Sequence, residues 1–380
     1  MTSGGGDIRI EDAENIVASL GSEVHRFSGK TILLSGGGGF LGRHLISVFR
    51  FLNRGCLSRP CKVISVDNYI TGELASLRDD AHRDPQIVDV WADVTYPLPV
   101  REDLNFIIHA AGVASPVYYM KYPLETIESA VQGTKNLMEV ARKNRELEGF
   151  LFFSSSEIYG DPDPQAIPTP ETYHGYVSSV GPRACYDESK RLGETISTVY
   201  YQQYNVPVKI VRPFNVFGPG MKHNDRRVIP MFAYEALNGR PLPVHGDGRQ
   251  TRTFCYVTDA IVGFLKVLLD GRQGEAYNIG NADNEISMGN LAEMYSSIVP
   301  GSVIKHISLI PTPTPAVSRN AGVRISRRQR GICGTHLRSI CKSGLLGSSR
   351  GRATRRAILG NRWSVVRLCV AGRDGLEARE

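Results

Sequence analysis

A glycine cluster between a predicted strand and a predicted helix constrains this chain more than any other feature. Residues 35–42 read SGGGGFLG, so Gly36, Gly39 and Gly42 have the spacing G-x-x-G-x-x-G. A tight turn, a close backbone approach to a pyrophosphate and a close contact of helix with strand each require a residue without a Cβ. The helix N-terminus then supplies N–H donors to the phosphates. The pattern predicts a dinucleotide site. The alternative is a flexible glycine turn, which the flanking strand and helix disfavour.

Short apolar strands alternate with helices along the first part of the chain. Strands are predicted over 31–35, 62–66, 86–90, 105–109, 150–155 and 208–212, and helices over 40–53, 124–143 and 184–204. This alternation predicts an α/β fold with a doubly wound parallel Rossmann sheet, whose ligands bind at the carboxyl ends of the strands. The later elements are shorter, with helices over 229–237, 258–269 and 287–298 and a strand over 276–279. They predict a smaller C-terminal substrate lobe.

The chain of 380 residues divides into four predicted segments. These are an N-terminal extension with one helix over 10–20 (1–29), a dinucleotide-binding Rossmann domain (30–212), a substrate-binding lobe interleaved with the sheet (213–311) and an atypical tail (312–380). Residues 161–182 contain five prolines, so this stretch is predicted to be a surface loop.

The tail differs in kind from the rest of the chain. Residues 312–380 hold 14 Arg, 1 Lys and 3 acids, whereas residues 1–311 hold 30 basic and 35 acidic side chains and all Tyr and Phe. Such a segment is expected to be disordered or out of frame. A genuine basic tail is the alternative. Because the net charge of +7 comes from this segment, the folded part has no basic surplus, and no specific nucleic-acid partner is expected.

Cysteine, histidine and hydropathy patterns exclude several other classes. The seven cysteines form no Cys-x-x-Cys pair and the nine histidines no His-x-x-x-His pair, so reduced thiols and no metal site are expected. We find no run of eighteen apolar residues and no signal sequence near the start. The expected location is the cytoplasm.

A carboxylate is predicted at the end of the second strand. Asp67 follows Gly42 by twenty-five positions, where it can accept hydrogen bonds from a ribose diol. A 2′-phosphate would be repelled there, so NAD is favoured over NADP; a turn or helix-capping Asp is the alternative. Asp93, after the third strand, is a candidate for the adenine edge or a solvated turn residue. The predicted NAD contacts are Gly36, Gly39, Phe40, Leu41, Gly42, Asp67, Asn68, Asp93, Ala110, Tyr186 and Lys190.

A tyrosine and a lysine are predicted one helical turn apart, at the edge of the sheet where the cofactor is expected. Tyr186 and Lys190 lie at i and i+4 of the helix over 184–204, where a fixed positive charge favours the phenolate. A phenol so placed can act as a base. The strand over 150–155 ends in a run of serines followed by Glu157, so Ser155 and Glu157 emerge at the same sheet edge.

These residues together resemble the extended short-chain dehydrogenases, over about 30–311. The resemblance rests on the glycine loop, His109-Ala110-Ala111-Gly112, Ser155/Tyr186/Lys190 and the segment RPFNVFGP at 212–219. SSSEIYGDP at 154–162, CYDESKR at 185–191 and HNDRRV at 223–228 are most similar to the UDP-glucuronate decarboxylases. Ser189 departs from that family, which usually has Gly there.

The resemblance implies a reaction and a role for each residue. Tyr186 would take the proton of the sugar 4-hydroxyl while hydride passes to NAD, with Lys190 lowering the phenol's pKa and Ser155 holding the oxygen. The 4-ketone then lies β to the carboxylate, which favours loss of carbon dioxide. Glu157 would orient the sugar or take part, through a water molecule, in proton transfer at C5. Ser156, Asn215, Arg227 and Arg252 are the predicted substrate contacts, the last three for the pyrophosphate.

The resemblance also implies a homodimer in which helices 124–143 and 184–204 form a four-helix bundle. A nucleotide-sugar 4,6-dehydratase is a weaker alternative, because Ser156 stands where that family carries an acid. A 4-epimerase and an NAD-binding protein inactivated by an aberrant C-terminus are further alternatives. The decarboxylases continue beyond 311 with an arginine that meets the substrate carboxylate. That segment is not found here, so we expect impaired turnover.

Overall fold

The structure, a computed structural model, describes residues 8–72, 84–222 and 224–308. Its centre is a seven-stranded parallel sheet with the strand order β11-β6-β5-β4-β1-β2-β3. The strands are β1 (Thr31–Ser35), β2 (Lys62–Asp67), β3 (Ile87–Trp91), β4 (Phe106–His109), β5 (Gly149–Phe153), β6 (Val208–Pro213) and β11 (Ala276–Ile279). Strand order reverses between β1 and β4, which is the switch point where such sheets bind ligands.

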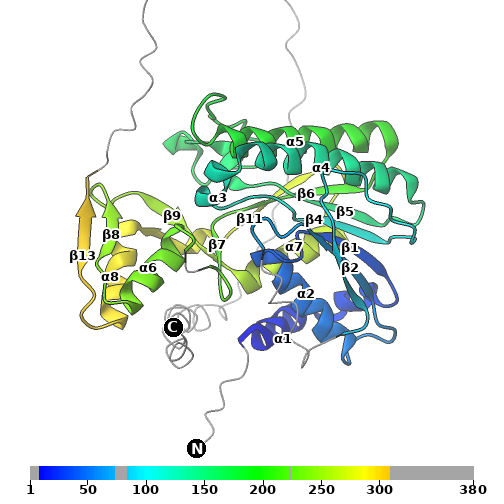
Figure 1. Ribbon diagram of the computed structural model, residues 1–380, viewed down its shortest axis with the longest axis horizontal. Coiled ribbons are helices and arrows are strands. Elements are labelled where there is room, and N and C mark those ends of the chain that lie inside the picture. The colour runs from blue at the N-terminus through cyan, green and yellow to red at the C-terminus, as the bar shows by residue number, and fades with distance from the viewer. Residues whose placement is uncertain (1–7, 73–83, 223, 309–380) are drawn as a thin grey trace, which may run out of the picture.

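Two layers of helices cover the sheet, as Figure 1 shows. On one face lie α4 (Pro123–Lys143) and α5 (Ala184–Tyr204), and on the other α1 (Ile8–Leu20), α2 (Phe40–Asn53) and α7 (Val257–Asp270). Successive residues of β1 alternate between the two cores: Leu33 packs toward α4, whereas Ile32 and Leu34 pack toward α2 and α7. Both faces are therefore buried, which explains why the strands are apolar throughout.

The segments after β6 build a smaller lobe and also complete the main sheet. The lobe contains α6 (Val228–Leu237), α8 (Met288–Ile298) and three strand pairs: β8 (Leu242–His245) with β13 (Ile304–Ile307), β7 (Val216–Phe217) with β10 (Cys255–Tyr256), and β9 (Thr251–Thr253) with β12 (Glu285–Ser287). Phe232 and Tyr295 meet edge to face in its core, with ring centroids 5.7 Å apart. β11 and α7 return to the main sheet after the first segments of the lobe. The exact domain boundaries stay a prediction.

The sequence correctly predicted the long elements and missed the short ones. Every predicted strand and helix is present, with bounds within two residues of those expected. The strands of the lobe have only two to four residues each, which is too short to show a periodicity. The same holds for the short helix α3 (Pro116–Lys121). The predicted loop over 161–182 contains one 3-10 turn, Pro164–Ala166. The predicted tail over 312–380 lies outside the described residues.

One strand ends earlier than predicted, and the difference concerns the site. β5 ends at Phe153 instead of continuing through Ser155. The Ser155 hydroxyl accepts a hydrogen bond from the Glu157 N–H, 3.2 Å away, and caps a 3-10 helix over Ser156–Tyr159. A serine that caps a turn in this way competes with the strand ladder. No helix of the described ranges is long and apolar enough to cross a membrane.

Candidate active site

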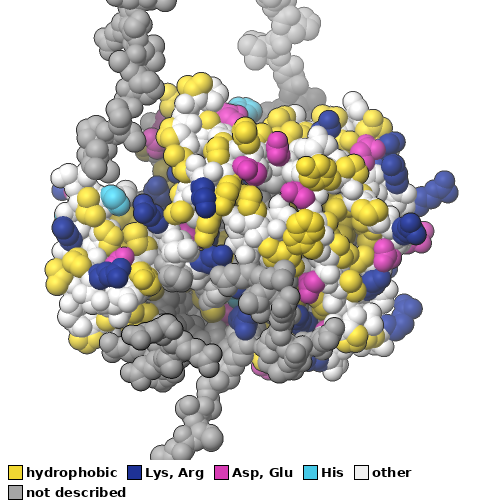
Figure 2. Space-filling model, viewed as in Figure 1, with side chains coloured by type: hydrophobic (Ala, Val, Ile, Leu, Met, Phe, Trp, Pro, Cys, Tyr) yellow, Lys and Arg dark blue, Asp and Glu magenta, His cyan; other side chains and the backbone are white. Residues whose placement is uncertain are grey.

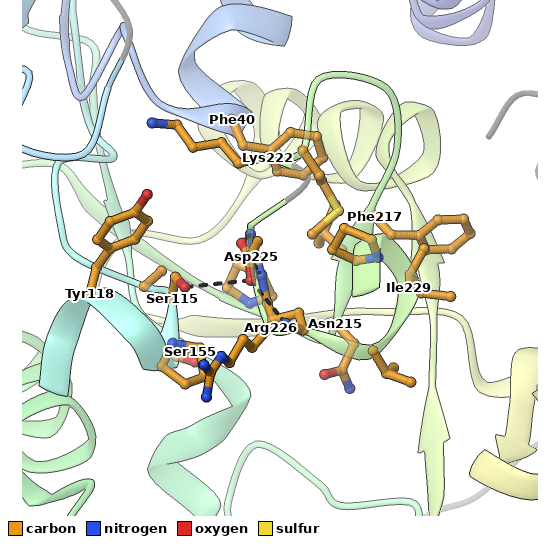
Figure 3. Close-up of a pocket in the computed structure, with 18 of the residues that line it drawn as sticks. Phe40, Ser115, Tyr118, Ser155, Asn215, Phe217, Lys222, Asp225, Arg226 and Ile229 are labelled. Atoms are coloured by element: carbon orange, nitrogen blue, oxygen red, sulfur yellow. Dashed lines mark hydrogen bonds and ion pairs between the residues drawn. The ribbon is translucent and has the colours of Figure 1, made fainter. Parts of the chain in front are cut away.

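A cavity of about 570 Å³ lies between the carboxyl ends of the central strands and the smaller lobe. Figure 3 shows side chains from both sides around it, with Phe40, Ser115 and Ser155 from the sheet side and Asn215, Asp225 and Ile229 from the lobe. The predicted site residues that line it are Gly36, Gly39, Phe40, Leu41, Gly42, Ala110, Ser155, Ser156, Glu157, Tyr186, Lys190, Asn215, Arg227 and Arg252. The predicted residues Asp67, Asn68 and Asp93 are not part of its lining.

The glycine loop has no room for side chains. Gly36 has a φ of +82°, and a Cβ there would lie 2.6 Å from the backbone nitrogen of Ala111. A Cβ on Gly42 would lie 2.1 Å from the carbonyl oxygen of Gly36. Gly39 caps α2, so the first N–H groups of that helix face the cavity edge that this loop forms. The loop is thus shaped for close approach of an anionic group to the backbone, as a dinucleotide pyrophosphate requires.

Asp67 stands at the end of β2 beside this loop. Its carboxylate accepts from the N–H of Gly38 (2.9 Å) and of Tyr69 (2.7 Å), which fixes its orientation. Burial raises the pKa of Asp67, and the backbone N–H donors act against that rise. Asn68 donates to Asp93 over 2.9 Å, so the side chains of these two predicted NAD-binding residues are hydrogen-bonded to each other.

Tyr186 and Lys190 are both buried at the floor of the cavity. The Lys190 ammonium donates to the carbonyl of Phe153 over 2.7 Å and lies 5.9 Å from the centre of the Tyr186 ring. Burial lowers the pKa of Lys190 to about 8. The pKa of Tyr186 is raised by burial, and the Ser155 hydroxyl and the Arg227 charge act to lower it. Burial is the largest of these effects, and the lowering of the phenol's pKa by Lys190 stays a prediction.

Glu157 is ion-paired with a residue that the sequence did not single out. Its carboxylate contacts the guanidinium of Arg183, which also lies 3.7 Å from Asp187. Arg183 precedes Tyr186 by three residues and lines the cavity. Asp187 is buried, its pKa is raised by burial, and one of its oxygens has no hydrogen-bond partner among the described atoms. Arg183 thus connects the predicted acid to the helix of the predicted base.

On the lobe side, a predicted phosphate contact already has an internal partner. Arg227 donates to the buried carboxylate of Asp225 at 2.5 and 2.9 Å, and Ser115 donates to the same carboxylate at 3.4 Å. Asn215 has a φ of +37° and donates to the carbonyl of Thr253, whereas Arg252 donates to the carbonyl of Thr251. Of the two predicted arginine contacts, Arg227 is therefore the one whose charge is balanced by a carboxylate of the described residues.

The cavity is nevertheless strongly cationic. Among the described residues, seven basic side chains line it, against the two carboxylates of Glu157 and Asp225. The basic residues are Arg43, Arg183, Lys190, Lys222, Arg226, Arg227 and Arg252. This excess suits ligands with several negative charges, such as a dinucleotide and a nucleotide sugar. Arg43, Arg183, Lys222 and Arg226 were missed because an isolated basic residue has no sequence pattern of its own.

A cradle for a pyrophosphate at the switch point of a parallel sheet, beside a buried tyrosine–lysine pair, defines a dinucleotide-binding enzyme of the short-chain dehydrogenase type. Residues 32–280 match the model of the NAD dependent epimerase/dehydratase family, and the chain belongs to this family. The resemblance inferred from the sequence is thereby confirmed at the family level.

Known relatives place the chain more finely. UDP-glucuronic acid decarboxylase 3 of Arabidopsis thaliana is 38% identical over 281 residues, which are 74% of this chain and 78% of that protein. UDP-glucuronic acid decarboxylase 1 of Xenopus tropicalis is 38% identical over 271 residues, 71% of this chain and 60% of that protein. Among solved structures, the dTDP-glucose 4,6-dehydratase of Bacillus anthracis in complex with NAD is similar, with a TM-score of 0.62 and 25% identity. That match covers 74% of this chain and 85% of the other.

Proposed function

We propose that this chain is an NAD-dependent decarboxylase that converts UDP-glucuronate to UDP-xylose. The observation that carries the proposal is the meeting of Ser155, Tyr186 and Lys190 with the Glu157–Arg183 pair in one cationic cavity beside the glycine loop. The two relatives reported above bear the name of this activity.

The residues present fit NAD. The close contacts around Gly36 and Gly42 leave a backbone cradle that a Cβ would fill, and the carboxylate of Asp67 is held at the end of β2. We expect Asp67 to accept from the ribose diol and to disfavour a 2′-phosphate. When bound, NAD would accept hydride from the sugar C4 and return it to the same carbon.

The chain's own residues supply the proton transfers and the orientation. Tyr186 takes the proton of the 4-hydroxyl as the C4–H bond breaks, and Ser155 holds the resulting ketone oxygen by a hydrogen bond. The C5–C6 bond then breaks, carbon dioxide leaves, and the electron pair moves onto the C4 oxygen as an enolate, which Tyr186 and Ser155 stabilise. A proton is added at C5 near Glu157. Tyr186 finally returns its proton to the C4 oxygen, so the net reaction consumes one proton and releases carbon dioxide.

Residue 156 discriminates against dehydration. A 4,6-dehydratase must protonate a departing 6-hydroxyl, and Ser156 has no acid to do so. The similarity to a dehydratase structure therefore supports a common fold and a common oxidation step, and it does not support dehydration as the reaction of this chain.

Incubation with UDP-glucuronate and NAD, following carbon dioxide and the nucleotide-sugar products, tests the proposal. We expect carbon dioxide and UDP-xylose in equal amounts with no net reduction of NAD. A 4-keto-6-deoxy product from a nucleotide hexose, or a C4 epimer without carbon dioxide, would assign the site to the alternatives.

We also propose a cytoplasmic homodimer. Apolar side chains are exposed along α4 and α5 and just before them, namely Met120, Leu124, Ile127, Leu192, Val199 and Tyr204. Figure 2 shows apolar side chains over this part of the surface, with acidic side chains among them. Leu192 and Val199 are seven residues apart on α5 and so share one helix face. Such a face suits the self-complementary contact of a twofold dimer.

A further inference from the structure

The ring of the proposed base is held outside the main cores. Tyr186 belongs to a small separate cluster with Val113 and Tyr119, to which Ile70, Tyr118 and Cys185 add partly buried surface. Within this cluster the rings of Tyr119 and Tyr186 are stacked, with centroids 5.4 Å apart and planes inclined by 16°. Both side chains are buried, at 3% and 7% exposure. A nearly parallel stack of two buried rings restricts how either can rotate about its bond to the backbone.

Tyr119 is itself fixed by the short helix that carries it. Its N–H donates to the carbonyl of Ser115 over 2.9 Å, the first turn of α3, and its own carbonyl lies 3.7 Å from the Cys185 sulfur. Cys185 directly precedes Tyr186, so backbone and ring of Tyr119 both contact the segment that carries the base. α3 continues through Tyr122 into α4, which packs along α5. One ring of the stack is therefore held by α3 and the other by α5.

The neighbouring tyrosine points elsewhere. Tyr118 lies under the Lys222 ammonium, 5.7 Å from its ring centre, and its hydroxyl accepts from Asn224 over 3.4 Å. Figure 3 shows Tyr118 reaching into the cavity from α3. Successive residues of a helix point about 100° apart, so Tyr118 takes another direction than Tyr119, whose ring is the one stacked on Tyr186. The Tyr119 hydroxyl has no hydrogen-bond partner among the described residues, although Tyr119 lines the cavity.

We propose that Tyr119 is a positioning residue for proton transfer by Tyr186, because its stacked ring fixes the plane in which the phenol oxygen meets the sugar hydroxyl. This inference rests on the proposed function and adds a residue to it. Tyr186 exchanges a proton with the C4 oxygen twice in each cycle, and Ser155 must contact the same oxygen. A small rotation of the phenol would lengthen both contacts, and misplacement by about 1 Å can reduce a rate by about a hundredfold.

Two substitutions separate the ring from its hydroxyl. In Tyr119→Phe the stack remains, so kcat with UDP-glucuronate is expected to stay within about threefold of the wild-type value. In Tyr119→Leu the flat ring is lost, and kcat is expected to fall by about tenfold or more while KM and NAD affinity change by less than about threefold. Tyr122→Leu is the matched control, because Tyr122 lies on the same segment and is not part of the cavity lining. It is expected to behave as the wild type.

The pH profile gives a readout that a merely structural role would not move. Burial raises the pKa of Tyr186, and the nearby Tyr119 phenol adds to that rise. Removing the ring admits water beside the Tyr186 phenol. The limb of the kcat–pH profile assigned to Tyr186 should therefore move to lower pH in Tyr119→Leu, and by less in Tyr119→Phe, which loses only the hydroxyl of residue 119. The loss of kcat in Tyr119→Leu should persist at high pH, where the phenol is ionised in every variant, and such a pH-independent loss indicates lost geometry rather than a smaller ionised fraction of Tyr186.

Several outcomes would overturn the inference. A Leu variant with kcat within about threefold of wild type would do so. A variant with unchanged kcat and a raised KM would show a substrate contact instead. If thermal unfolding shows that the Leu variant does not fold, Tyr119→Met places a flexible, unbranched side chain there without a flat ring, and full activity in that variant would equally refute the stack. A wild-type chain that releases no carbon dioxide from UDP-glucuronate contradicts the proposed function, whereas an active wild type with an equally active Leu variant contradicts only this inference.

Discussion

Arg183 and Glu157 both line the cavity and form an ion pair, although they are separated by 26 residues in the chain. The pair joins the 3-10 turn after β5 to the first turn of α5. Both side chains are partly exposed, so the pair contributes little to the stability of the fold. Its consequence is to fix the Glu157 carboxylate in the lining of the cavity that Tyr186 also lines, where we propose that it transfers a proton at the sugar C5.

Glu157→Gln should therefore impair catalysis more than binding. The amide keeps the shape of the side chain and removes its charge and proton capacity, so kcat should fall by about 10² to 10⁴. NAD affinity, measured by titration, should hardly change. Glu188→Gln is the control, because Glu188 pairs with Arg191 on α5 and is not part of the cavity lining. Equal activity of the two variants would show that Glu157 has no role in the reaction.

Tyr186→Phe should remove the base and leave the ring in place. The stack with Tyr119 survives in this variant, so NAD binding should remain while turnover falls by about 10² to 10⁴. Single-turnover measurement of nicotinamide reduction reports the first step directly. Turnover within about tenfold of the wild type would show that the assigned role is wrong.

Lys190 should make the stability of the fold depend on pH. Its pKa in the folded chain is about 8, below the ordinary value of 10.5. Between these two pH values the unfolded chain binds more protons than the folded chain. Stability contributed by this group should therefore rise with pH through this window, by up to about 1.4 kcal/mol per unit. Denaturant unfolding of wild type and Lys190→Met across this range checks it. Identical slopes for the two proteins would contradict the buried, titrating amine.

The exposed apolar positions on α5 should mediate dimer formation. Leu192→Glu combined with Val199→Glu places charges on the shared face and should convert a dimer to a monomer at micromolar concentration, measured by light scattering. Lys266→Glu, on α7 at the other face of the sheet, is the control and should leave the mass unchanged. A wild-type chain that is already monomeric would refute the proposed dimer.

Breaking the buried ion pair behind the site should destabilise the fold. Arg212 makes two contacts with Glu194 at 2.7 and 2.9 Å and also donates to the carbonyl of Glu171, which ties the loop over 161–182 to α5. Glu194→Ala leaves the guanidinium buried without its partner, at an expected loss of about 3–5 kcal/mol in the free energy of unfolding. Glu188→Ala, at an exposed pair, should cost less than about 1 kcal/mol. Similar losses for both would contradict the burial of the Arg212 pair.

The sequence by itself determined the fold class of this protein and the edge of the sheet where its site lies. Glycines at 36, 39 and 42, the strand and helix periods around them, and the four-residue spacing of Tyr186 and Lys190 are all local patterns. Backbone sterics and side-chain periodicity act over a few residues, so such patterns predict local structure and the edge where strand ends converge. Long elements were therefore placed within two residues of their observed bounds, and most of the predicted site residues line one cavity.

Only the tertiary structure decided which charges and rings meet. Arg183 with Glu157, Asp225 with Ser115 and Tyr119 with Tyr186 are separated by 26, 110 and 67 positions in the chain, and no local pattern links the members of any pair. Burial of Tyr186 and Lys190, which sets the direction of their pKa shifts, likewise depends on how the layers pack around them. Desolvation and ion pairing depend on distance in space, whereas a sequence pattern records distance along the chain.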